Sequence, residues 1–260
     1  MSPELKKFIK KEKRFRKKVF ITQILLTIGI LVLWELLTRV GVLNSFITSS
    51  PSKIVTTLIN LFENNNIFLH IMTTFNETII SFLICTIGSL IISIVLYKSR
   101  FLSKVIDPFL TLFNSLPKVA LGPIIIIWLG ANTKSIIAMA VFISIIVSIQ
   151  TIHNGFLKTD KNKIKLMKTF NASEKDILLK VVIPSNKHII INTLKINISM
   201  CLIGVIMGEF LTSKAGIGYL ILYGSQVFNL DLVMTGIILL MIFSILLYKV
   251  ISYVEKKETV

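Results

Sequence analysis

Apolar residues in this chain are gathered into a few long runs, and this grouping limits the fold more than any other feature of the sequence. An apolar helix of roughly 20 residues is long enough to cross a bilayer core of about 30 Å. Soluble domains disperse their apolar residues along the chain. A membrane β-barrel needs alternating strands of about ten residues, and the sequence has no such pattern. The sequence therefore predicts an all-α polytopic membrane protein.

Six apolar runs predict six transmembrane helices. The expected spans are residues 19–37, 71–97, 105–129, 135–155, 189–211 and 232–250. The expected division is a basic arm at 1–18, the first span with an extracytoplasmic segment at 19–66, a transmembrane core at 67–254 and a tail at 255–260. After Pro51, apolar residues recur at helical spacing, which indicates a short amphipathic helix lying at the membrane interface.

The positions of the basic residues predict the orientation of the chain. The net charge is +16, and 23 of the 29 lysines and arginines fall in four segments that share one side of the membrane: 1–18, 98–104, 156–188 and 249–260. Basic residues are in excess in cytoplasmic loops. We therefore expect both termini and the 156–188 loop in the cytoplasm of a multi-pass inner-membrane protein. The charge marks topology and contact with anionic membrane lipid rather than nucleic-acid binding.

The cysteines and histidines predict neither a disulfide nor a metal site. Cys85 and Cys201 lie within apolar runs, as buried thiols do. His70, His153 and His188 share no metal-ligand spacing. The chain also lacks the P-loop pattern G-x-x-x-x-G-K-[ST], so it is not expected to bind ATP.

The 156–188 loop carries signals for two helices joined by a turn. Ser173, with Asp176 three residues later, matches a helix N-cap signature. Asn171 precedes this cap and follows a helical pattern at 161–170; asparagine is the best non-glycine residue for a turn with positive φ. Pro184 is expected to end the second helix, because proline disfavours helical geometry in the residue before it.

The second helix also carries an apolar stripe. Its members are Ile177, Leu178, Val181 and Val182. The loop either packs against the ends of the spans or docks a soluble cytoplasmic partner. Its separate caps and its own stripe favour docking.

Several stretches, in a shared order, resemble the permease subunits of binding-protein-dependent ABC importers, and more narrowly the nitrate/sulfonate/taurine subgroup. The resemblance covers about residues 50–256. Its motifs are KLMKTFNASEKDILLKVVIPS at 165–185, Asp107–Pro108, PKVALGPIIIIWLG at 117–130, Leu194–Lys195, and Glu209 followed by GIGYLI at 216–221.

The cytoplasmic loop departs in part from the family pattern E-A-A-x-x-x-G followed by I-x-L-P. Lys165 replaces the glutamate, which reverses a charge, and Asn171 replaces the glycine while keeping the turn geometry available. Glu77 stands where the family often has arginine. The positions that fit are Ala172, Ser173, Val181, Val182 and Pro184.

The resemblance implies a transport subunit that is not an enzyme and binds no cofactor, with a cytoplasmic coupling-helix loop between spans 4 and 5. Its implied partners are a second copy of this chain, two cytoplasmic ATPase subunits that bind ATP, and an extracytoplasmic solute-binding protein. The implied ATPase-docking residues are Lys165, Asn171, Ala172, Ser173, Ile177, Val181 and Pro184.

The implied solute is small: a sulfonate, taurine or nitrate, or alternatively a vitamin precursor such as a thiamine pyrimidine or riboflavin. Lys118, between Pro117 and Pro123, either attracts an anionic solute or lies in a wet crevice between helices. Glu209 either has a gate or packing role or is solvated at the interface. A lipid-modifying enzyme is a remote alternative, because the spans supply few convergent acids, histidines or serines.

Overall fold

The computed structural model describes residues 3–64 and 66–258, with side chains over 8–64 and 67–253, and every regular element in this part is a helix. The long helices are α1 (Pro3–Arg39), α4 (Asn66–Lys98), α7 (Thr133–Leu157), α11 (Lys187–Thr212) and α13 (Leu230–Glu258). The shorter ones are α2 (Ser45–Thr48), α3 (Pro51–Glu63), α5 (Arg100–Ser115), η1 (Lys118–Leu121), α6 (Gly122–Leu129), α8 (Lys161–Thr169), α9 (Glu174–Ile177), η2 (Leu178–Val182), α10 (Ile183–Ser185) and α12 (Ile217–Gln226). Of the tail, residues 259–260 lie outside the described part.

Five helices in the described part are long and apolar enough to cross a membrane, and there are six spans if one bent pair counts as a span. These five contain the expected spans 1, 2, 4, 5 and 6, and the prediction of an all-α polytopic fold is confirmed. The amphipathic helix expected after Pro51 is α3, which Ser50 caps by accepting from the Lys53 amide.

The third span, expected at 105–129, is not a single helix. The chain here forms α5 followed by η1 and α6, and these two parts meet at an angle of 91°. Leu116 at the joint is extended, because the ring of Pro117 disfavours helical geometry in the preceding residue. The break frees carbonyl groups at the end of α5. The Lys118 ammonium donates to the Asn114 backbone oxygen and side-chain oxygen, both at 3.2 Å.

The centre of the bundle is α7, which packs against α4 and α11 more extensively than any other helices in the described part pack together. Gly204 on α11 lies so close to Ala140 on α7 that a Cβ there would overlap the Ala140 backbone. Small residues are enriched where membrane helices approach closely. The interface also contains a fully buried polar group, Asn197, which accepts from the Ser148 hydroxyl and donates to the Thr86 hydroxyl.

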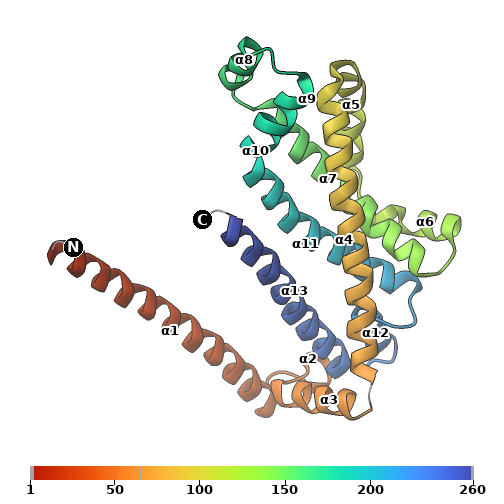
Figure 1. Cartoon of the computed structure of the whole chain (residues 1–260). Helices are drawn as coiled ribbons and strands as arrows, with labels where there is room; N and C mark the ends of the chain where they lie inside the picture. Colours follow the sequence, from red (N-terminus) through yellow and green to blue (C-terminus); the bar gives the residue numbers. More distant parts are fainter. Residues whose placement is uncertain (1–2, 65, 259–260) are drawn as a thin grey trace.

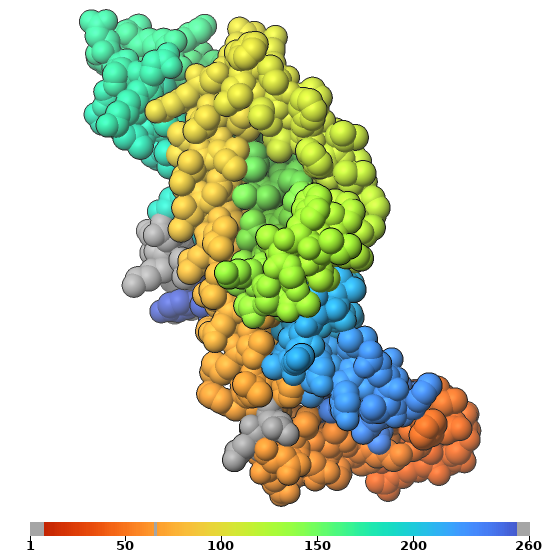
Figure 2. All heavy atoms as spheres, turned by 90° about the vertical axis from the view of Figure 1, so that its right-hand side faces the viewer, coloured from red at the N-terminus to blue at the C-terminus, as the bar shows by residue number. Residues whose placement is uncertain are grey.

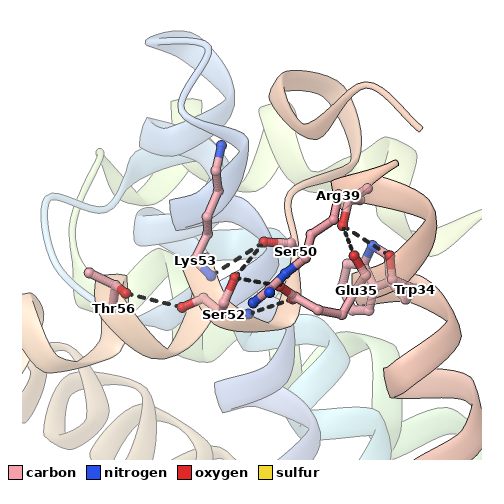
Figure 3. A network of polar contacts seen from close by, with 8 residues as sticks. Trp34, Glu35, Arg39, Ser50, Ser52, Lys53 and Thr56 are labelled. Carbon is pink, nitrogen blue, oxygen red and sulfur yellow. Dashed lines mark hydrogen bonds and ion pairs between the residues drawn. The ribbon is translucent and has the colours of Figure 1, made fainter. Parts of the chain in front are cut away.

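The basic arm and the first span form one continuous helix, α1, rather than two separate segments. In Figure 1, α1 extends away from the bundle, and none of its apolar window is buried. Its C-terminal end is held by Glu35, whose carboxylate accepts from the Ser52 amide (3.1 Å) and hydroxyl (3.0 Å) on α3 and from Arg39 (2.8 Å) (Figure 3). The first span is thus joined to the rest of the described chain through α2 and α3.

The two ends of the molecule carry different elements. Helices α8, α9 and α10 lie at one end of the bundle, and α2, α3 and α12 lie at the opposite end (Figure 1). Figure 2 shows the α5–α6 segment, yellow to light green, on the outside of the face formed with α4, with part of α7 behind it. The 156–188 loop and the α3 helix therefore lie at opposite ends of the bundle.

We expect a cysteine at Lys161 to be protected from a membrane-impermeant maleimide in intact cells, and a cysteine at Asn64 to react. The reason is the cytoplasmic excess of basic residues, combined with the opposite positions of these two exposed residues. The native thiols give no background, because Cys85 and Cys201 are 0% exposed. Labelling of the Lys161 variant alone would reverse the predicted topology.

Candidate functional site

The turn predicted at Asn171 is present, and its geometry ends α8. Asn171 has φ 54°, in the left-handed region. Its amide donates to the Lys168 carbonyl (3.0 Å), and the amide of Ala172 donates to the Met167 carbonyl (3.1 Å). This pair of bonds is the Schellman motif, which satisfies the last carbonyl groups of a helix. Asparagine therefore takes the position where glycine is usual.

The N-cap predicted at Ser173 is also present. The Ser173 hydroxyl accepts from the Asp176 amide (3.1 Å) and donates to the Asp176 carboxylate (2.5 Å). Lys180 forms an ion pair with the same carboxylate at 2.7 Å. The Lys180 ammonium, with the Ser173 hydroxyl, lowers the pKa of Asp176 to about 2. Because an unfolded aspartate has a pKa of about 3.9, this stabilisation is present above about pH 4 and is lost as the pH falls through about 2.

The prediction that Pro184 ends the second helix is wrong. Ile183 is helical (φ −60°, ψ −51°), and α10 continues through Pro184. The preceding turn, η2, is a π-helix, in which the Ile183 amide donates to the Leu178 carbonyl five residues back. A π-turn widens the helix and re-pairs backbone groups that a proline would leave unmatched. The chain therefore passes from α9 to α11 with only one short turn, at Asn186.

The apolar stripe packs inward against the transmembrane helices. Ile177, Leu178 and Val182 form one buried cluster with Ile152 and Phe156 of α7, and residues of α4 pack on it. Ile177, expected on the docking surface, is 5% exposed and anchors the loop instead; Val181 is half-buried. Burying three such side chains stabilises the loop by several kcal/mol, at about 1.5–3 kcal/mol each.

The outward face of the loop is formed mainly by α8 and the turn after it. Lys165, Asn171, Ser173 and Pro184 are exposed, and Ala172 is half-buried. Three large apolar side chains that the sequence pattern did not single out are exposed. They are Leu166 (58% exposed), Phe170 (73%) and Leu179 (51%). The sequence pattern does not show which apolar side chains of the loop face outward. That depends on which of them pack on the transmembrane helices, as Ile177, Leu178 and Val182 do.

At the other end of the bundle, Glu209 is fully buried and holds the start of α12. Its carboxylate accepts from the Gly218 amide (2.5 Å) and from the Thr74 hydroxyl (2.6 Å) on α4. Thr74 in turn accepts from the Ile217 amide (2.8 Å). The first amides of a helix have no partner within it, and an acid nearby is favourable. We call Glu209, Thr74 and His70, with the backbone of 216–218, the Glu209 cluster.

The turn into α12 requires glycine. Gly216 has φ 117°, and a Cβ there would overlap the Glu209 carboxylate. The Gly216 amide donates to His70 Nδ1 (3.0 Å), and the His70 ring stacks on Tyr219 with a centroid distance of 5.9 Å. Of the two roles considered for Glu209, the structure supports packing, because the carboxylate is 0% exposed.

Glu77 is a second buried acid beside the Glu209 cluster. It is 2% exposed, and within the described residues neither of its carboxylate oxygens meets a hydrogen-bond partner. Glu209 is its neighbour across the contact between α4 and α11. The arginine common at this position in the resembling family would place a cation beside Glu209. In this chain two acids meet instead.

The two residues suggested for a solute path share no contact. Lys118 is half-buried at the bend of the third span and bonds to Asn114, whereas Glu209 bonds to Thr74 and Gly218. The structure thus gives each residue a local structural part, and a role in solute passage stays a prediction. Among the described residues, no three His, Cys, Asp or Glu side chains are grouped as metal ligands.

We expect the same substitution to have opposite effects at the two neighbouring acids. Glu77→Gln should leave the melting temperature of the purified chain unchanged or raised, because the carboxylate it replaces has no hydrogen bond to lose. Glu209→Gln should destabilise the folded chain by about 1–3 kcal/mol. Both carboxylate oxygens of Glu209 accept hydrogen bonds, from the Thr74 hydroxyl and the Gly218 amide, and the new amide nitrogen would face one of these donors. Thermal unfolding in detergent measures both. Greater destabilisation by Glu77→Gln would contradict the assigned partners.

Comparison with known proteins places this arrangement in a family. Residues 86–259 match the family model described as the binding-protein-dependent transport system inner membrane component. A Haemophilus influenzae protein described as a probable ABC transporter permease is 28% identical over 232 residues, which is 89% of this chain and 94% of that protein. A Bacillus subtilis protein described as a putative aliphatic sulfonates transport permease, SsuC, is 23% identical, over 90% of this chain and 85% of its own length.

Other similarities agree on the architecture. The formylaminopyrimidine transport permease protein ThiX of Halalkalibacterium halodurans is 24% identical over 73% of this chain and 75% of its length. A chain of the inward-facing MetNI methionine ABC transporter superposes with a TM-score of 0.64 at 18% identity, covering 72% of this chain and 93% of that chain. At this identity the likeness concerns the fold. Because the family model matches well over half of its residues, the chain belongs to the inner-membrane permease components of binding-protein-dependent ABC transporters.

Proposed function

We propose that this multi-pass permease subunit forms, with a second copy of itself, the translocation path for a small oxyanion such as a sulfonate, taurine or nitrate. As a member of its family the chain is not catalytic, and ATP is bound by separate ATPase subunits of the complex. The observation that carries the proposal is the cytoplasmic loop, which is braced against the spans on one face and presents exposed apolar side chains on the other.

The proposed ATPase contact is the outward face of α8 and the Asn171 turn. Leu166 of α8 and Phe170, the C-cap residue of that helix, lie four residues apart and therefore on the same side. Both are exposed. Apolar side chains grouped on a surface beyond the membrane are typical of a protein interface. Lys165, where the family has an acid, adds a positive charge that an acidic group on the ATPase would complement. Ile177, which packs on the transmembrane helices, and the half-buried Val181 would support this surface from the side that faces the bundle.

The proposed pairing of two copies follows from the number of docking loops. Each chain offers one such loop, and the complex implied by the family resemblance contains two ATPase subunits. A solute-binding protein on the extracytoplasmic side would deliver the solute, and both termini would lie in the cytoplasm. Movement of the ATPases would reach the spans through the buried cluster around Ile177 and Phe156.

The proposed solute class rests on the similarity to two proteins described as putative aliphatic sulfonates transport permeases, from Bacillus subtilis and Escherichia coli, which are 23% and 24% identical to this chain. The similarity to ThiX supports the alternative, a formylaminopyrimidine or another vitamin precursor. The two classes differ in the groups they carry. The first has a negatively charged sulfonate or nitrate group, which in taurine accompanies an ammonium, and the pyrimidine has no such group.

We expect the reconstituted transporter, with its ATPase and binding protein, to take up radiolabelled methanesulfonate or taurine in an ATP-dependent manner. Labelled formylaminopyrimidine should not accumulate above the level seen without ATP. The control is the same complex with the P-loop lysine of the ATPase replaced. Uptake of the pyrimidine alone would replace the oxyanion proposal with the alternative.

We expect Asn171→Val to weaken ATPase retention by the purified permease and to lower its ATP hydrolysis. A β-branched residue at positive φ costs at least about 1 kcal/mol more than asparagine, so the Schellman turn would open. Asn171→Gly should behave as the parent, because glycine adopts this geometry freely.

A matched control for this variant is Asn162→Val, the same change at an exposed position in the first turn of α8, where φ is helical. It should cost only a few tenths of a kcal/mol. If Asn171→Val holds its ATPase and hydrolyses ATP as well as Asn162→Val does, the turn does not determine docking.

A further inference from the structure

Helix α5 has a polar side that no other described helix covers. Asp107, Thr111 and Asn114 follow each other at intervals of four and three residues, so they lie on one side of the helix, and Ser115 lies beside them. These four residues are exposed in the single chain. The half-buried Lys118, just beyond the end of α5, returns to this side, because its ammonium bonds to both oxygens of Asn114. We call these five residues the α5 polar side.

The α5 polar side lies at the depth of the transmembrane helices. Phe113 of α5 meets Phe142 edge to face, with ring centroids 6.5 Å apart, and Phe142 is near the middle of α7 (Thr133–Leu157). One turn earlier, Leu110 packs in a buried cluster with residues of α4 and α7. Both of these helices are long and apolar enough to cross a membrane. Asn114, next to Phe113, is therefore expected well inside the bilayer core.

The exposed surface of α5 is divided into an apolar and a polar part. Leu112, which is 58% exposed, belongs to the apolar part and suits contact with lipid. On the polar side, the hydroxyls of Thr111 and Ser115 donate to carbonyl oxygens four residues back, at 3.0 and 2.9 Å. In the described part of the chain, the carboxylate of Asp107 and the amide nitrogen of Asn114 have no hydrogen-bond partner. Such groups are costly against lipid, so this side requires water or another polar surface.

The two charges of the α5 polar side lie at its two ends. Asp107 is in the first half of α5, which begins at the end of the bundle that carries α8, α9 and α10 (Figure 1). Lys118 is at the bend, deeper in the predicted membrane. Its ammonium meets the neutral oxygens of Asn114, and none of the ion pairs among the described residues includes it. The deep end of the polar side is therefore positively charged.

We propose that the α5 polar side is a wall of the solute path and that Lys118 selects small oxyanions at its deep end. The same side of a second copy lies opposite, because a two-fold pair brings identical surfaces together, and water fills the space between them. The Lys118 ammonium, the Asn114 amide and the hydroxyls of Thr111 and Ser115 are donors suited to a sulfonate or nitrate group. This inference rests on the proposed function for the second copy and for the oxyanion.

The first measurement tests whether the α5 polar side meets water. The full transporter, in lipid nanodiscs that leave both membrane surfaces accessible, carries Thr111→Cys. The matched control is Leu112→Cys, at the next residue and on the apolar part of α5. Cys85 and Cys201 are 0% exposed and give no background. The probe is the anionic 2-sulfonatoethyl methanethiosulfonate, which reacts with a thiolate.

We expect Thr111→Cys to react about a hundredfold faster than Leu112→Cys, because a thiolate forms in water and not in the bilayer core. Two slow reactions would show that lipid or a dry protein surface covers the polar side. Two fast reactions would show that α5 lies outside the bilayer. Either result would overturn the proposal.

The second measurement tests the charge selectivity at Ser115→Cys, three residues from Lys118. The anionic probe is compared with the cationic 2-(trimethylammonio)ethyl methanethiosulfonate, each rate divided by its rate with free mercaptoethanol. We expect the anionic probe to react about tenfold faster, because a nearby positive charge acts in a medium of low effective dielectric. Lys118→Gln should remove this preference, Lys118→Arg should keep it, and Lys53→Gln, at an exposed lysine on α3, should not change it. A preference that survives Lys118→Gln would overturn the assigned selectivity.

A lipid phosphate could bring the same oxyanion chemistry to Lys118, so the rates are compared in phosphatidylcholine and phosphatidylglycerol nanodiscs. A solute path predicts a preference that depends on Lys118 in both lipids, and slower modification in millimolar methanesulfonate. A preference that is lost in phosphatidylglycerol would assign Lys118 to a headgroup and overturn the solute path.

The transport assay distinguishes failure of this inference from failure of the proposed function. Uptake of the pyrimidine, together with a reactive Thr111→Cys and an anionic preference at Ser115→Cys, would overturn the proposed solute and support the α5 polar side as a wall of the path. Uptake of methanesulfonate with an unreactive Thr111→Cys would overturn this inference and leave the proposed function standing.

Discussion

Within a bilayer core no water is present to bond a polar group, so every break in a helix and every buried side chain must find its partner inside the protein. The irregular parts of this chain follow from that constraint. At the bend of the third span, Lys118 bonds to the oxygens that α5 leaves open. At the start of α12, Glu209 and Thr74 accept the amides that a helix end exposes. In the centre, Asn197 joins α4, α7 and α11.

The same constraint makes Glu77 the exception. Within the described chain it is a buried acid without a hydrogen-bond partner, next to another acid. A buried polar group without a partner costs stability. One that is present in a native structure therefore calls for an explanation, such as a change of partner in another conformation. Its neighbour Glu209 ties α11, α4 and the α12 turn together, so a rearrangement at this point would reach three elements at once.

One helix connects the two ends of the molecule. Helix α11 starts one residue after α10, at Lys187, and carries the Glu209 cluster near its other end. Asn186, at its start, donates to the Thr159 hydroxyl (2.7 Å) at the beginning of the loop. A displacement of the loop would therefore reach the Glu209 cluster through α11.

The 156–188 loop has one side packed on the bundle and one side left exposed. Its buried side, around Ile177 and Val182, packs on α4 and α7, while Leu166 and Phe170 are left on the outside. The Schellman turn at Asn171 and the Ser173 cap fix the angle between these two parts. These contacts order the loop in the single chain, so docking of the proposed partner would not have to order it first.

The sequence by itself determined the features that depend on local geometry and on transfer from water to lipid. The apolar runs predicted the spans, the spacing around Ser173 predicted its cap, and asparagine at 171 predicted the positive φ, because each depends on residues close in the chain. The tertiary structure alone decided which side of each helix is covered. It placed Ile177 inward, carried α10 past Pro184 through a π-turn, bent the third span at Pro117, and brought Glu77 to Glu209 and Lys195 to Tyr248. These outcomes depend on contacts between helices far apart in the sequence, and the pattern along one helix does not specify its neighbours.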